Sequence, residues 1–120
     1  SNAVLRSEGA DPKDPAAQAL VWASYTELPT TALYVGGKTL EKTPVVIAVT
    51  TPEGALDEGG RGTLVSDIGE VVDDLIGVFP GRLNHWTMLH ELDEGSWAGA
   101  GQIFKLADIQ GAMNIHPAQV

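Results

Sequence analysis

Three residues of one predicted strand, His85, His90 and Glu91, carry side chains that bind metal ions in other proteins. Successive side chains of a strand point to opposite faces, and positions 85 and 90 are separated by an odd number. The two imidazoles therefore do not converge, and we predict no metal site there. The chain has no cysteine, which excludes thiol nucleophiles and thiolate ligands.

Two arginines and one tryptophan are the candidate substrate-binding residues. Arg61 could bind an anion, but Asp57 lies four residues earlier on the same predicted helix, so a solvated ion pair is favoured. Arg82 precedes the last long strand and could face the mouth of a cleft. Trp97 could form the wall of a pocket, or pack against a neighbouring subunit, as tryptophan often does.

Two further motifs resemble catalytic ones but lack a required feature. "GGKT" at 36–39 resembles a phosphate-binding loop, but Ala32 stands where that loop needs its first glycine. Asp73 and Asp74 are adjacent on a predicted helix, and adjacent helix positions do not face each other. We predict neither a phosphate loop nor a carboxylate pair.

The composition indicates one globular domain. The chain has 120 residues, of which 43% are hydrophobic, and its formal net charge is −9. This charge would repel nucleic acids and anionic membranes, and no apolar run is long enough to span a bilayer. The cytoplasm is the default expectation. We interpret residues 1–3 as a tag remnant, residues 4–113 as the domain and residues 114–120 as a tail.

Hydrophobic periodicity and glycine positions predict the elements that position these residues. Seven apolar residues recur at helical spacing and predict one apolar stripe: Leu64, Val65, Ile68, Val71, Val72, Leu75 and Ile76. Asp57 is a candidate N-cap of this helix, and β-branched and aromatic residues dominate the predicted strands. The prediction comprises a helix end closed by Gly9, a strand over 19–28, a loop with a short hairpin at Gly36-Gly37, a strand over 44–51 that is buried on both faces, a helix over 56–77, a strand over 82–92, a glycine-rich loop to 101 and a short C-terminal helix or hairpin arm.

The order strand–helix–strand from Pro44 onward predicts two parallel strands with a helical crossover on one face. We therefore predict an α+β fold, with a mixed sheet and helices on one face only. The other face would be bare, so we expect another chain to cover it.

Part of this unit occurs twice. At an offset of 64 residues Trp22 matches Trp86, Leu28 matches Leu92, and Gly37 matches Gly101. Residues 4–37 thus correspond to the latter part of the complete unit at 44–101. We interpret Trp22 and Trp86 as core or interface anchors.

The strand that starts at Pro44, the following "VTTPEGALDEGGRGTLVSDI" and the segment "LHELDEGSWAGAG" together resemble the tautomerase superfamily. The resemblance implies βαβ units, here of the fused two-unit type, assembled as trimers or hexamers without a cofactor. It also implies a proton transfer in a small enol or 2-oxo acid by the free amine of an N-terminal proline.

The resemblance places Pro44 at the position of the family's proline, but Thr43 precedes it, so its nitrogen is an amide without basicity. The proline of the first unit would fall before residue 1. The family's arginines fall near Ala55 and at Trp22 and Trp86, and its pocket aromatic falls at Trp97 and, in the first copy, at Leu33.

We therefore predict a tautomerase-like isomerase. We expect this chain to be inactive, because none of its residues supplies the amine base. The alternatives are a non-catalytic oligomeric or small-ligand-binding module of the same fold, and an enzyme whose first strand and helix lie upstream. The expected partners are further copies of the chain and a small carboxylic acid, with no nucleic acid or membrane.

Overall fold

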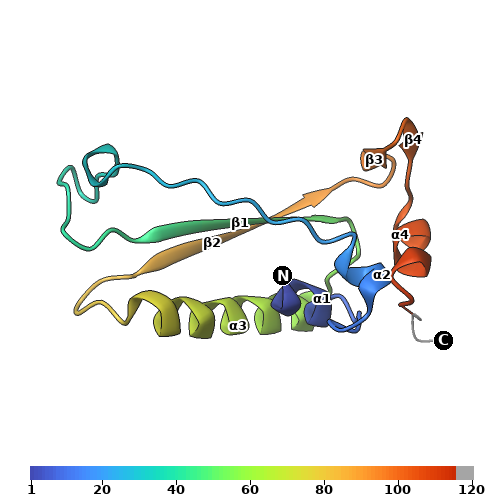
Figure 1. The fold of residues 1–120 in the computed structure, drawn as a ribbon, viewed down its shortest axis with the longest axis horizontal. Coiled ribbons are helices and arrows are strands. Elements are labelled where there is room, and N and C mark those ends of the chain that lie inside the picture. The colour runs from blue at the N-terminus through green and yellow to red at the C-terminus, as the bar shows by residue number, and fades with distance from the viewer. Residues whose placement is uncertain (116–120) are drawn as a thin grey trace.

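The computed structural model describes residues 1–115 and has an α+β architecture (Figure 1). The chain forms strand β1 (Val45–Pro52), helix α3 (Glu58–Ile76) and strand β2 (His85–Leu92) in succession. The two strands pair in parallel, from Val45 opposite His85 to Pro52 opposite Leu92. This is the predicted strand–helix–strand arrangement, with the helix crossover that parallel neighbours require.

Helix α3 begins where Asp57 caps it and ends at a glycine. The Asp57 carboxylate accepts a 2.6 Å hydrogen bond from the Gly60 amide, and Gly77 ends the helix with a φ of 80°. Leu64, Ile68 and Val72 are buried against the sheet, whereas Val65, Val71 and Leu75 are exposed. The apolar stripe is therefore narrower than the sequence predicted.

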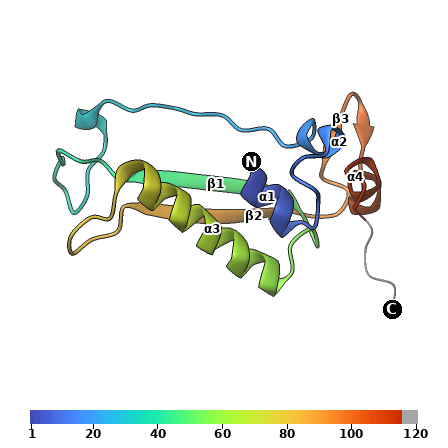
Figure 2. The ribbon, with the colours of Figure 1, turned by 60° about the horizontal axis from the view of Figure 1, so that its bottom comes forward.

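The two faces of the sheet differ in cover. Helices α1 (Asn2–Ser7) and α3 lie on one face (Figures 1 and 2), where Ile47, Val49 and Leu89 pack against the core of α3. Val46, Trp86 and Met88 point to the other face and are exposed. The prediction that β1 is buried on both faces is wrong, because burial alternates along it.

A second core lies at the end of the sheet. Helices α1, α2 (Pro15–Gln18) and α4 (Leu106–Ala112) meet around a small group of buried side chains. These are Leu5, Ala10, Ala17 and Met113. Since Leu5 belongs to this core while Ala3 and Val4 pack against the α3 core, α1 joins the two.

The predicted helix end at Gly9 is confirmed, and Asn2 and Ala3 already belong to that helix. The short hairpin at Gly36-Gly37 is also confirmed, as a bridge between Val35 and Lys38 beyond the single turn η1 (Thr30–Ala32).

The predicted strand over 19–28 is wrong. Ala19 and Leu20 form the turn that ends α2, and residues 21–28 are extended but pair with no strand in residues 1–115 (Figures 1 and 2). The mixed sheet is wrong too: β3 (Ala98–Gly99) and β4 (Gln102–Ile103) form a separate antiparallel pair. A strand exists only when its backbone finds a partner, and composition alone does not provide one. Of the predicted tail, residues 116–120 lie outside the described part of the chain.

Candidate functional site

A hollow of about 410 Å³ lies where β1 and β2 begin. Three segments that are far apart in the sequence line it. They are the hairpin at Leu33–Gly36, the start of β1 at Pro44–Val46, and the approach to β2 with Arg82, Leu83, His85 and Trp86. The parallel pairing of β1 with β2 brings the last two segments together, because parallel strands begin at the same edge of a sheet.

Arg82 is the one cation among the lining residues, which include no carboxylate. One guanidinium nitrogen, Nη2, donates a 3.0 Å hydrogen bond to the Lys42 carbonyl oxygen. The guanidinium carbon lies 4.3 Å from the centre of the Phe79 ring. These contacts hold the side chain in place, and a guanidinium has five N–H donors. The remaining donors suit a carboxylate, with which arginine forms charge-assisted pairs.

Asn84 orients the neighbouring His85. The Asn84 amide nitrogen donates to a carboxylate oxygen of Asp73 at 2.7 Å and to the Gly77 carbonyl at 2.9 Å. The Asn84 side-chain oxygen therefore accepts the 2.6 Å hydrogen bond with His85 Nδ1, which places the proton on Nδ1. In a neutral ring Nε2 is then the proton acceptor. From the sequence, His85 was a candidate only for metal binding, and nothing indicated that it lines the hollow at Pro44.

Arg61 lies at the opposite end of the strands. Its Nη1 is 3.6 Å from Glu91 Oε1 and donates a 3.1 Å hydrogen bond to the Leu56 carbonyl. The predicted partner Asp57 instead caps the helix, so the predicted Arg61–Asp57 ion pair is wrong. Eight-residue strands separate this end from Arg82, a span of roughly 20 Å. Arg61 and Arg82 do not form one site.

Trp97 directly precedes β3 and is half-buried. Its carbonyl oxygen accepts a 2.9 Å hydrogen bond from the Phe104 amide, across the β3–β4 hairpin. It does not line the hollow at Pro44. Of the four residues singled out from the sequence, the structure brings Pro44 and Arg82 together and leaves Arg61 and Trp97 elsewhere.

The tautomerase resemblance aligns several positions of this chain with site residues of the family. Three of these positions line this hollow: Leu33, Pro44 and Trp86. Trp86 is not a core anchor, since 64% of it is exposed. Trp22, its counterpart in the first copy, is 90% exposed, so the core reading is wrong for both tryptophans. No pattern in the sequence predicted that the hairpin residues would lie near Pro44.

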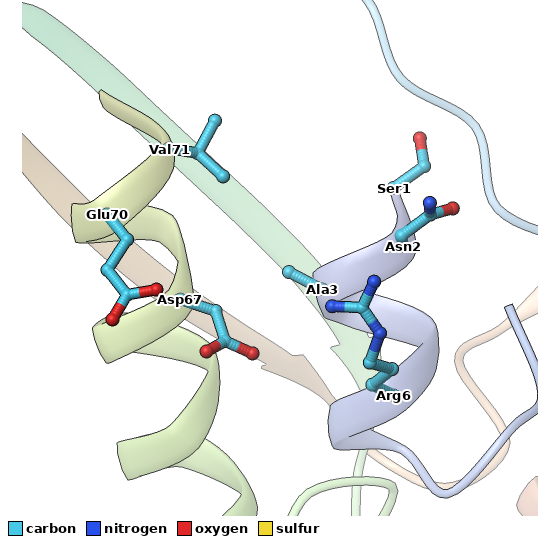
Figure 3. Close-up of a pocket in the computed structure, with 7 residues that line it drawn as sticks. All are labelled: Ser1, Asn2, Ala3, Arg6, Asp67, Glu70 and Val71. Carbon is cyan, nitrogen blue, oxygen red and sulfur yellow. The ribbon is translucent and has the colours of Figure 1, made fainter. Parts of the chain in front are cut away.

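A larger hollow of about 500 Å³ lies between α1 and α3. Figure 3 shows the Arg6 side chain extending into it, opposite Asp67 and Glu70 of α3. Two carboxylates beside one guanidinium disfavour an anionic ligand. Its remaining lining residues are Ser1, Asn2, Ala3 and Val71.

The histidines lie as the strand geometry predicts. His85 is half-buried on the face covered by α3, near Gly69, and His90 is exposed on the open face. Residues 1–115 contain no group of three His, Asp or Glu side chains that could hold a metal ion. None of the helices in this part of the chain is both long and apolar enough to cross a membrane.

Comparisons of the chain with models of protein families, with curated proteins and with solved structures found no match. The tautomerase resemblance therefore stays a prediction.

Proposed function

We propose that the hollow at Pro44 binds a small enol or 2-oxo acid, and that the chain is a tautomerase-like isomerase module. One observation supports this most strongly. Leu33, Pro44 and Trp86 stand at positions that the resemblance aligns with the family's pocket aromatic, proline and arginine, and they line one hollow together with Arg82, although Leu33 is not aromatic and Trp86 is not basic. These residues come from three separate segments, so their meeting is not a consequence of sequence proximity.

The lining suits a small organic acid. Leu33, Val35, Val46 and Trp86 offer apolar surface, and Arg82 offers a charge for the carboxylate. The chain carries a net charge of −9, so a site without carboxylates is where an anion meets least repulsion. The volume of about 410 Å³ is in the usual range for small-molecule pockets.

The hollow lacks the base that the resemblance requires. The Pro44 nitrogen is bonded to the Thr43 carbonyl, and its lone pair is delocalised into that amide. We expect this chain to bind the acid without isomerising it. The second candidate, a non-catalytic ligand-binding module, is favoured by this same amide bond, and only measurable turnover would argue against it.

Calorimetric titration with phenylpyruvate, a 2-oxo acid with an aromatic side chain, tests the binding. Charge-assisted hydrogen bonds contribute about 1.5–3 kcal/mol, so Arg82→Gln should weaken binding by roughly 10- to 150-fold. Arg61→Gln is the matched control and should leave binding unchanged, because Arg61 lies at the other end of the strands. Equal loss in both variants, or no binding by the unmodified chain, contradicts the proposed site.

Ketonisation of phenylenolpyruvate tests the chemistry. We expect no rate above the uncatalysed reaction. Turnover that Pro44→Ala abolishes would show that Pro44 is more than structural. Turnover that survives Pro44→Ala would show that another group supplies the base.

A further inference from the structure

The segment Val21–Leu28, here called the arm, is an extended stretch whose backbone is unpaired. Within residues 1–115, no backbone hydrogen bond joins residues 22–28 to another part of the chain. Its aromatic side chains also lack cover, since Trp22 is 90% and Tyr25 is 83% exposed. Aromatic and β-branched residues favour strands, so this is a strand-forming sequence without a partner.

The sheet offers the complementary feature. Within residues 1–115 it consists of β1 and β2 alone, so no described segment pairs with the edge of β1 that faces away from β2. β1 reads "VVIAVTTP" and contains no charged residue that would discourage pairing. Long, apolar, uncharged edges recruit further strands, and a two-stranded sheet is only marginally stable by itself.

The arm runs along the β1 side of the sheet in both views (Figures 1 and 2), but it does not pair with β1. Its N-terminal end is fixed, because Val21 packs against the core around Leu5 and Met113. Its C-terminal end leads to η1 and to the hairpin that lines the hollow at Pro44.

We propose that the arm of one copy adds to the free edge of β1 in another copy, so that copies exchange arms in a closed assembly. Each copy supplies one arm and accepts one, so two or three copies form a closed ring in which every arm and every β1 edge is paired. Only one charged residue, Glu27, lies in the arm, and none lies in β1. The net charge of the chain is therefore not concentrated where the copies meet.

The exposed aromatic side chains would supply a substantial part of such an interface. An aromatic side chain buries about 150–250 Å², so Trp22, Tyr25 and Trp86 of two copies expose roughly 700–1,200 Å². Val46 and Met88 add to this on the open face. Stable interfaces bury about 1,200–2,000 Å² in total. This proposal does not depend on which ligand the hollow binds.

Sedimentation at micromolar concentration tests the assembly. We expect a mass that is a multiple of the 12.6 kDa chain. Ser24→Pro with Tyr25→Pro removes two successive backbone donors of the arm, so one of them faces the partner in either register, and the mass should fall to that of one chain. Ser24→Ala with Tyr25→Phe keeps both donors and the ring, and should leave the assembly intact.

A cross-link distinguishes exchange between copies from pairing within one chain. The protein has no cysteine, so Tyr25→Cys and Ala48→Cys can be placed on two separately tagged chains and mixed. A disulfide that joins the two tags supports exchange. A monomeric unmodified chain, an assembly that survives the double proline variant, or a disulfide that forms only within a chain carrying both cysteines would overturn the proposal.

Discussion

The side-chain amide of Asn84 and the carboxylate of Asp73 lie 2.7 Å apart and join the start of β2 to the last turns of α3. Asn84 is only 7% exposed, and it also holds the Gly77 carbonyl and, through its own carbonyl, the Val45 amide of β1. The Asn84 side chain therefore fixes the helix end to the start of β2, and its backbone carbonyl joins the same residue to β1, at the edge where the hollow forms.

Replacing Asn84 should loosen this junction. Asn84→Ala leaves the partly buried Gly77 carbonyl and His85 Nδ1 without their partner, and an unsatisfied buried group costs about 1–3 kcal/mol. We expect the free energy of unfolding, measured by urea denaturation, to fall by about 2–4 kcal/mol. Ser66→Ala, on the exposed side of α3, should change it by less than about 0.5 kcal/mol. Equal effects in both variants would contradict this role of Asn84.

Replacing Thr87, in contrast, should raise the free energy of unfolding. Its hydroxyl oxygen is buried among the described residues without a hydrogen-bond partner. Thr87→Val keeps the shape of the side chain and removes the unsatisfied group. We expect the free energy of unfolding to rise by about 1 kcal/mol, seen as a higher urea midpoint at an unchanged slope. A lower midpoint would show that the hydroxyl has a partner in solution.

Replacing each of two glycines of α3 by alanine tests how closely α1 packs on this helix. A methyl group at Gly60 would lie 3.0 Å from the Ser7 carbonyl oxygen of α1, whereas one at Gly62 would meet nothing within 4 Å. Gly62→Ala should stabilise by about 0.5–1 kcal/mol through helix propensity. Gly60→Ala should destabilise by about 1 kcal/mol, because overpacking outweighs that gain. Similar gains in thermal stability in both variants would mean that α1 does not pack closely on α3.

Glu8 makes stability depend on pH. Burial raises the pKa of its carboxyl from 4.5 to about 7. The folded chain thus binds more protons than the unfolded chain between these values, so stability falls as pH rises through this range. We expect a loss of about 1–3 kcal/mol between pH 4.5 and pH 8, reduced by the water that reaches the group.

Urea denaturation of Glu8→Gln across this pH range is the check, and its stability should vary less with pH. Glu70→Gln, which removes an exposed carboxylate from α3, should keep the pH dependence of the unmodified chain. An unchanged slope in Glu8→Gln would mean that another group carries the effect.

Local patterns in the sequence predicted much of the fold. The spacing of Leu64, Ile68 and Val72 predicted α3, and Asp57 predicted where it begins. The β-branched run after Pro44 predicted β1 to within a residue. These features depend on neighbours along the chain, so the sequence contains the information directly.

Features that depend on distant segments were less predictable. The arm has the composition of a strand, yet no partner pairs with it within the described residues. Arg61 pairs with Glu91, thirty positions away, in place of the nearby Asp57. Parallel pairing of the two strands predicts that Pro44 and Arg82 lie close together. The hairpin at Leu33–Gly36 reaches the hollow only through tertiary packing, which the sequence does not show directly.

Binding of a small 2-oxo acid in the hollow at Pro44 can be tested directly through the tryptophans. The chain has three tryptophans, Trp22, Trp86 and Trp97, and each gives one indole N–H signal in a ¹⁵N–¹H spectrum. Titration with phenylpyruvate should shift the Trp86 signal and leave that of Trp97 unchanged, with the shift lost in Arg82→Gln. A shift at Trp97 alone, or no shift at Trp86 at saturating ligand, would contradict the claim.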